Sequence, residues 1–244
     1  MAQQHEHSGR TLVLVHGTPL SPSVWDQTAG YLGHRVIHTP DCTRVPDSPA
    51  AQAKLAEAVM AEVVGDVDVV GHSFGGQIAI EMALLAPDRV HSLMLLCTRD
   101  TPFPPFAPLA TQVRNAHGPT VDASLERWFT EAELDAGMAA ISSAREQLST
   151  ADPIRWAAAL DAIAGYDSSD LTPTLRMPVT VVAAGRDHVS TPDAMGDMAR
   201  RIPFAKFVVR PDWAHMSAFT VPDVLAEIID HATDDSRLLP PAKP

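Results

Sequence analysis

One serine lies in a sequence context that predicts a nucleophile. Residues 71–76 read Gly-His-Ser-Phe-Gly-Gly, which matches the pattern G-x-S-x-G around Ser73. An apolar run, Val67–Val70, precedes this motif, and an amphipathic run, Gln77–Leu85, follows it. A serine at the tip of a sharp strand-to-helix turn needs small neighbours, and the glycines supply them. The alternative is a glycine-rich turn that carries no chemistry.

A serine nucleophile needs a base, and the base needs an acid that orients it. The chain supplies these in the order Ser, Asp, His that accompanies the motif. Asp187 follows the apolar run 178–184, and His215 lies between the last strand-like run and the last helical one. Residues that follow parallel strands gather at one edge of a sheet. The pattern therefore predicts Ser73, Asp187 and His215 as the catalytic residues.

Other acids and histidines fit these roles less well. Asp100, which follows the strand-like run ending at Cys97, is the alternative acid. His188 adjoins Asp187 and is a poor partner for its carboxylate. His72 adjoins the nucleophile, so we expect its ring to point away from the reacting face. Five further histidines have no matching context: His34, His38, His91, His117 and His231. His5 and His7 lie in a terminus that we expect to be mobile.

Two backbone N–H groups are expected to bind the oxyanion that forms during acyl transfer. Phe74 follows the nucleophile and begins the next helix. Thr18 lies in the loop after the first strand, where Pro19 has no N–H to donate. We expect Gly17 to let this loop come close to the substrate.

The composition indicates one domain with an insertion. The chain has 244 residues, of which 45% are hydrophobic, and its formal net charge is −12. This acidic balance argues against nucleic acid or an anionic membrane as a partner. No apolar stretch approaches membrane-spanning length, and no secretory signal is visible, so we expect a cytoplasmic protein.

The two cysteines predict neither a disulfide framework nor a metal site, because they are isolated in the sequence. Cys97 ends an apolar run and is expected in the core. Cys42 lies in a predicted loop, where we expect it to be exposed. No metal and no cofactor are expected.

Apolar strand-like runs alternate with helical ones along most of the chain. Strands are expected at 11–15, 35–38, 67–70, 90–97, 178–184 and 206–209, and helices at 49–64, 77–85 and 221–231. Continuous apolar strands separated by helices are typical of a parallel sheet that is covered on both faces. The predicted fold class is therefore α/β, with a doubly wound, mostly parallel sheet.

The segment 101–171 differs from the rest of the chain. It opens with Thr-Pro-Phe-Pro-Pro-Phe-Ala-Pro, which does not easily continue a strand or start a helix. Helical stretches follow at 124–129, 131–148 and 153–163. We expect a core of 10–100 and 172–233, a helical cap of 101–171 over the carboxyl edge of the sheet, and a loosely ordered tail of 234–244. A separate helical domain is the alternative.

The combination of His16-Gly17, the motif around Ser73, Asp187 and His215 resembles the α/β-hydrolase superfamily. The resemblance covers most of the chain on both sides of the helical insertion. It implies that the serine, the acid and the histidine form a catalytic triad. It also implies that the cap shapes the substrate pocket.

The start of the chain is similar to that of one branch of this superfamily. Only ten residues precede Thr11, as in the plant-type methylesterases and hydroxynitrile lyases, which lack the leading antiparallel strands. The lyases tend to carry a hydroxyl residue after the first-loop histidine and a lysine after the catalytic one, where this chain has Gly17 and Met216. His72, before the nucleophile, also resembles the esterases. The resemblance therefore favours ester hydrolysis over cyanohydrin cleavage.

The expected function is hydrolysis of a small carboxylic ester or lactone through an acyl-serine intermediate. Candidates for lining an apolar pocket are Gly17, Trp25, Phe103, Phe106, Trp128, Trp156, Met216 and Phe219. Arg114, His117 and Arg145 are the candidates for meeting a substrate carboxylate. Two alternatives remain open on the same residues. One is a biosynthetic enzyme that uses acyl chemistry for cyclisation or C–C cleavage, and the other is a ligand receptor.

Overall fold

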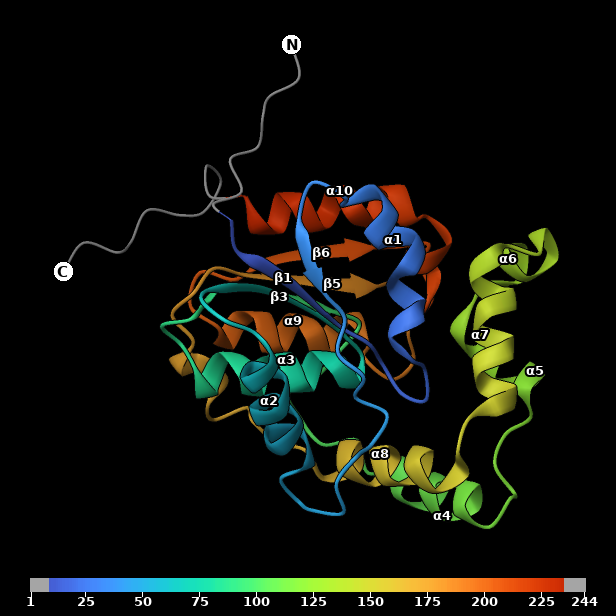
Figure 1. Ribbon diagram of the computed structural model, residues 1–244. Helices are drawn as coiled ribbons and strands as arrows, with labels where there is room; N and C mark the ends of the chain where they lie inside the picture. The colour runs from blue at the N-terminus through green and yellow to red at the C-terminus, as the bar shows by residue number, and fades with distance from the viewer. Residues whose placement is uncertain (1–8, 235–244) are drawn as a thin grey trace.

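The computed structural model of the protein describes residues 9–234. Its six strands form one sheet in the order β2-β1-β3-β4-β5-β6, and each neighbouring pair is parallel (Figure 1). The strands are β1 (Thr11–Val15), β2 (Val36–His38), β3 (Val67–His72), β4 (Val90–Leu96), β5 (Val179–Ala184) and β6 (Lys206–Arg210). The predicted α/β class and parallel sheet are confirmed. Apart from Asp234, the predicted tail lies outside the described residues.

Helices cover both faces of the sheet (Figure 1). On one face lie α2 (Ala51–Glu62), α3 (Phe74–Leu85) and α9 (Pro192–Arg201), and on the other lie α1 (Asp26–Tyr31) and α10 (Pro222–Thr233). The side chains of β1 alternate between these layers. Val13 and Val15 pack in the core with α2, α3 and α9, whereas Leu12 and Leu14 pack in the core with α10. This period of two explains why the last four positions of the strand, Leu12–Val15, are all apolar.

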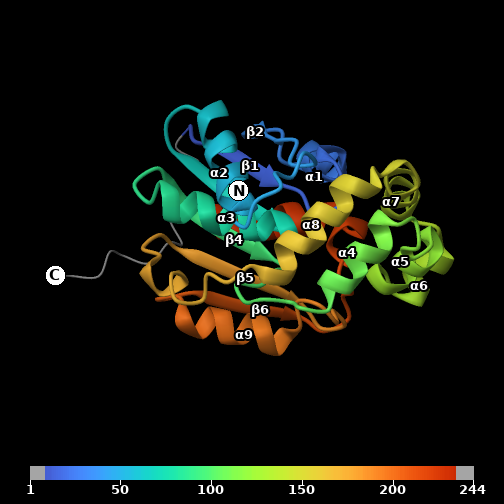
Figure 2. The same ribbon diagram turned by 90° about the horizontal axis from the view of Figure 1, so that it is seen from below.

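Five helices lie between β4 and β5 in the sequence and outside the sheet. They are α4 (Phe106–Arg114), α5 (Val121–Trp128), α6 (Glu131–Ala136), α7 (Ala139–Thr150) and α8 (Pro153–Gly165). In Figure 1, α5, α6 and α7 lie beyond the arrowheads of the strands and α4 and α8 lie below the sheet, and in Figure 2 all five gather on one side of it. Buried apolar side chains pack α4 against α8. These helices therefore lie beside the edge of the sheet at which the strands end.

Two predictions about these helices are wrong. The single helix predicted for 131–148 is interrupted at Gly137, whose φ of 60° ends α6 in a left-handed cap. A helix, α4, also begins at Phe106, within the proline-rich segment that was expected not to start one easily. Pro105 and Pro108 are tolerated because the first N–H groups of a helix have no acceptor within it.

Short elements escaped prediction because periodicity needs a longer window. They are α1 and the 3-10 turns Pro22–Trp25, Thr172–Thr174 and Ser217–Thr220. None of the helices within residues 9–234 is both long and apolar enough to cross a membrane.

Both cysteines are buried and unpaired. The expected exposure of Cys42 is wrong, because its loop folds back onto His16 and the Cys42 amide N–H donates to Nε2 of that ring at 3.0 Å. Burial raises the pKa of Cys42 to about 12 and raises that of Cys97 well above its usual value. Both thiols are therefore protonated near neutral pH.

Candidate active site

Ser73 occupies a strained turn between β3 and α3. Its φ of 55° and ψ of −120° lie outside the regions that a residue with a side chain usually adopts. Two hydrogen bonds hold the turn against the end of β4. The Ser73 amide N–H donates to Leu96 O at 3.0 Å, and Thr98 Oγ1 donates to Ser73 O at 2.7 Å. Such strain persists only where the surroundings enforce it, and it is typical of functional positions.

The turn packs directly against the backbone of the loop after β1. A Cβ atom placed on Gly75 would lie 2.3 Å from Val15 O and 2.5 Å from His16 O. A Cβ atom on Gly71 would lie 2.4 Å from Gly75 O. Neither position has room for a side chain, so these glycines set how closely the first loop approaches the nucleophile turn.

Gly17 allows a close approach to this same turn, not to the substrate as we expected. A Cβ atom at Gly17 would lie 2.9 Å from His72 Nδ1 and 3.0 Å from Ser73 Cβ. The residue does not line the pocket that contains Ser73. Its small size therefore serves the packing of the loop on the turn.

Asp187 and His215 are joined at the carboxyl edge of the sheet. His215 Nδ1 donates to Asp187 Oδ2 at 2.6 Å, and Asp187 Oδ1 accepts from the amides of Val189 at 2.8 Å and Ser190 at 3.1 Å. Burial alone would raise the pKa of Asp187. The adjacent imidazole and the amide donors outweigh that effect and hold its pKa below the usual value. Asp187 is therefore an ionised acceptor for the histidine.

The loop that carries His215 is held from two sides. His72 Nε2 donates to His215 O at 3.0 Å, and the two rings lie 4.9 Å apart. On the other side, the Ala214 amide donates to Ser217 Oγ at 2.7 Å, and Ser217 Oγ donates to Glu133 Oε2 of α6 at 2.9 Å. Burial lowers the pKa of His72 to about 3, so its ring is neutral and Nε2 carries the proton.

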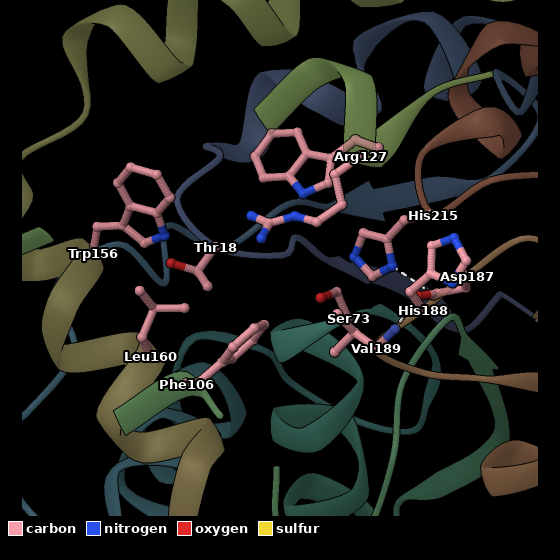
Figure 3. Close-up of a pocket in the computed structure, with 11 residues that line it drawn as sticks. Thr18, Ser73, Phe106, Arg127, Trp156, Leu160, Asp187, His188, Val189 and His215 are labelled. Atoms are coloured by element: carbon pink, nitrogen blue, oxygen red, sulfur yellow. Dashed lines mark hydrogen bonds and ion pairs between the residues drawn. The ribbon is translucent and has the colours of Figure 1, made fainter. Parts of the chain in front are cut away.

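One pocket collects Ser73, Asp187 and His215 with side chains from the helical segment. It is also lined by Thr18, Phe106, Arg127, Trp128, Trp156, Leu160, His188 and Val189. In Figure 3 the Ser73 hydroxyl and the His215 ring face the same space, and a dashed line joins His215 to Asp187. The sheet edge thus supplies Ser73, Asp187 and His215, and α4, α5 and α8 supply much of the wall.

The aromatic candidates divide between the pocket and the core. Phe106, Trp128 and Trp156 line the pocket, and Phe103 lines an adjoining groove. Three other candidates, Trp25, Met216 and Phe219, do not line it, because they are buried in the core between α10 and the sheet. The expectation that these three form the pocket wall is therefore wrong.

The three candidates for binding a substrate carboxylate, Arg114, His117 and Arg145, do not line the pocket. Arg114 pairs with Asp161 and Arg145 pairs with Asp122, both on the exposed surface. His117 is exposed and lines neither the pocket nor the adjoining groove. Sequence reasoning missed the charged residue that does line the pocket, Arg127, although it directly precedes a predicted pocket residue.

Asp100, the alternative acid, is not bonded to a histidine. Its buried carboxylate accepts from Arg201 Nη2 at 2.5 Å and from Thr172 Oγ1 at 2.8 Å. These contacts tie the end of β4 to α9 and to the segment that leads into β5. Asp100 is therefore part of the scaffold.

Of the two residues predicted to supply N–H groups, Phe74 directly follows Ser73, and Thr18 lines the same pocket as Ser73. Phe74 is the first residue of α3, so its N–H has no acceptor within the helix. Thr18 lines the pocket and also a second groove that runs over Pro19 and Cys42 toward α7 and α8. A helix N-terminus favours negative charge, which suits an oxyanion at this point.

Within residues 9–234, three potential metal ligands come within 4.8 Å of one another: His72, Cys97 and His215. Hydrogen bonds and packing account for this cluster. His72 Nε2 binds a carbonyl, His215 Nδ1 binds Asp187, and the Cys97 thiol is protonated because burial raises its pKa. A metal ion would require these groups to give up their protons.

The parallel sheet, the strained serine turn and the His–Asp pair at the sheet edge define an α/β enzyme scaffold of the hydrolase type. The chain belongs to the alpha/beta hydrolase family, whose sequence model matches residues 12–228. The predicted superfamily is thereby confirmed.

Similar proteins include esterases and a lactonase. The pimeloyl-[acyl-carrier protein] methyl ester esterase of Aromatoleum aromaticum is 28% identical and covers 90% of this chain and 96% of its own. The crystal structure of the enol-lactonase from Burkholderia xenovorans LB400 superposes with a TM-score of 0.82 at 22% identity, over 91% of this chain and 90% of that one. The structure of a malate-bound thermophilic esterase from Thermogutta terrifontis superposes with a TM-score of 0.78 at 29% identity, over 91% of this chain and 88% of that one.

Proposed function

We propose that this chain hydrolyses a carboxylic ester or a lactone, with Ser73 as nucleophile, His215 as base and Asp187 as the acid that orients it. One observation carries the proposal. His215 Nδ1 lies 2.6 Å from Asp187 Oδ2 in the same pocket that the strained Ser73 lines. The similar esterases and enol-lactonase support the same class of reaction.

Acylation begins with transfer of the Ser73 hydroxyl proton to His215 Nε2. Nδ1 is occupied by Asp187, so Nε2 is the nitrogen available to accept it. The serine oxygen attacks the ester carbonyl, and the carbonyl electrons move onto its oxygen. The ionised Asp187 stabilises the imidazolium that forms. When the tetrahedral intermediate collapses, the alcohol leaves with the proton from Nε2, and Ser73 remains acylated.

Deacylation repeats these steps with water. His215 Nε2 takes a proton from the water, whose oxygen attacks the acyl carbonyl. The carboxylic acid leaves as the proton returns to Ser73 Oγ. For a lactone, the alcohol and the acid are two ends of one product.

The amides of Phe74 and Thr18 bind the oxyanion in both halves of the reaction. Loss of one such donor typically costs 10²–10³ in kcat, about 2.7–4 kcal/mol of barrier. The donors here are backbone groups, so their contribution depends on how the first loop packs on the nucleophile turn. Gly75 and Gly17 control that packing.

The test is hydrolysis of a panel of short esters and lactones by wild type, Ser73→Ala and Asp187→Asn. We expect Ser73→Ala to lose nearly all turnover and Asp187→Asn to lose about 10⁴ in kcat, because its amide no longer enforces the right tautomer. Ser142→Ala, at an exposed serine of α7, is the matched control. Turnover by Ser73→Ala at the wild-type rate would refute the proposal. Product analysis separates hydrolysis from cyclisation or C–C cleavage.

A further inference from the structure

A single arginine of the helical segment enters the catalytic pocket. Arg127 lies in the last turn of α5 and lines the pocket with Ser73 and His215. It also lines the adjoining groove, as do His188 and Val189. In Figure 3 its guanidinium group extends into the space between Trp156 and His215. The positive charge therefore stands at the junction of the two hollows.

Within residues 9–234, the Arg127 side chain makes no ion pair and no hydrogen bond. Partial burial lowers its pKa, and burial is the sole cause of that shift. A guanidinium group remains charged in a protein even so. Removing part of the hydration of this charge costs free energy, and no acceptor or carboxylate of the fold offsets that cost.

The other arginines of this segment are paired with carboxylates. Arg114 binds Asp161, Arg145 binds Asp122 and Arg155 binds Asp152. All three pairs are largely exposed to solvent. Arg127 differs from them in both respects, because it is partly buried and lacks an acidic partner. This contrast favours a ligand for Arg127 over a role in the scaffold.

The remaining walls of the pocket leave this charge unmatched. Phe106, Trp156 and Leu160 are apolar, and the Asp187 carboxylate is bonded to His215 and to two backbone amides. One unpaired positive charge beside these three apolar side chains matches a ligand with one negative charge on an apolar stem. A dianion such as a phosphate monoester fits less well, because Asp187 adds negative charge to the same pocket.

We propose that Arg127 binds a carboxylate on the substrate, so that the pocket takes monoesters of short dicarboxylic acids or lactones that carry a free carboxylate. This inference rests on the proposed function and names its substrate class. The planar guanidinium offers two parallel donors to a carboxylate, and this bidentate contact fixes the position of the far end of the acyl chain. The ester carbonyl is then held toward Ser73.

The test compares monomethyl and dimethyl esters of the same dicarboxylic acids, from four to seven carbons. These pairs differ in one charge and in little else. Wild type is expected to favour the best monoester over its dimethyl ester by about tenfold in kcat/KM. This factor is the lower end of the range that a hydrogen bond to a charged group contributes. In Arg127→Gln that ratio should fall to about one, and in Arg127→Lys it should recover in part. Arg114→Gln, at a paired exposed arginine, should leave both substrates unaffected.

Two results would overturn the inference. One is a wild type with no preference for any monoester, and the other is an Arg127→Gln variant that keeps the wild-type ratio. Calorimetric measurement of how tightly the intact esters bind to Ser73→Ala tests the same preference without turnover. If wild type hydrolyses no ester, the proposed function fails, and this binding ratio still decides whether Arg127 selects an anion. Thermal melting shows whether each Arg127 variant is folded.

Discussion

Gly75→Ala is the change that most directly tests how the first loop positions the nucleophile. The new methyl group would lie 2.3 Å from Val15 O and 2.5 Å from His16 O. Side-chain carbons essentially never come closer than 3.0 Å to such an atom. The loop and the start of α3 must therefore move apart by about 0.7 Å at the least, because both sides of the contact are backbone.

This displacement affects stability and catalysis in different ways. Overpacking of this kind typically costs about 1–3 kcal/mol in the free energy of unfolding. The same movement separates the Thr18 amide from Phe74 and Ser73, which lie on opposite sides of the contact. A misplacement on the order of 1 Å can cost about 10²-fold in rate. We expect Gly75→Ala to remain folded and to lose about 10²-fold in kcat.

The assay measures kcat on an activated short ester together with urea unfolding. Gly30→Ala is the matched control, because Gly30 lies in α1 and its added Cβ would meet nothing within 4 Å. That control should keep the wild-type kcat and gain up to about 1 kcal/mol in stability. A Gly75→Ala enzyme with wild-type kcat and wild-type stability would refute the reasoning about this contact.

Three further predictions concern His72, the pKa of Asp187 and the two buried thiols. His72→Phe keeps the ring contact but loses the hydrogen bond to His215 O, so it should lower kcat by up to about tenfold. His72→Gln can still donate a hydrogen bond and should retain most of the activity. Steady-state kinetics checks both variants. Because the pKa of Asp187 is lowered in the fold, its ionised form stabilises the protein above the usual value of 3.8, and this contribution is lost as the pH falls through the lower folded value. Urea unfolding from pH 7 to pH 3 should therefore give a stability difference between wild type and Asp187→Asn that is constant above about pH 5 and decreases below pH 3.8. A difference that does not change with pH would contradict the lowered pKa of Asp187. Neither thiol should react with a thiol reagent at pH 8 in the native protein, since burial raises both pKa values, and both should react in guanidinium; rapid native labelling of Cys42 would show that its loop opens.

The residues at the sheet edge could be located from sequence because their position follows from general rules. An elbow motif fixes where a strand ends and a helix begins, and parallel strands bring their carboxyl ends to one edge. Ser73, Asp187 and His215 each follow a strand, and they line a single pocket.

The wall of the pocket could not be located in the same way. Trp25 and Trp128 belong to the same buried apolar cluster, yet only Trp128 also lines the pocket. The difference depends on how α4 to α8 pack, and no periodicity encodes it. Arg127 was missed for the same reason, since its lack of an acidic partner is visible only in three dimensions.

The central claim is that Ser73 is the nucleophile, and covalent labelling tests it most directly. A fluorophosphonate reacts with an activated serine, and mass spectrometry of the digested protein identifies the modified residue. We predict a single modification, on the peptide that contains Ser73, which disappears in Ser73→Ala, is slowed strongly in His215→Ala and is unaffected in Ser142→Ala. Modification at another residue, or at Ser73 with the same rate in His215→Ala, would contradict the account.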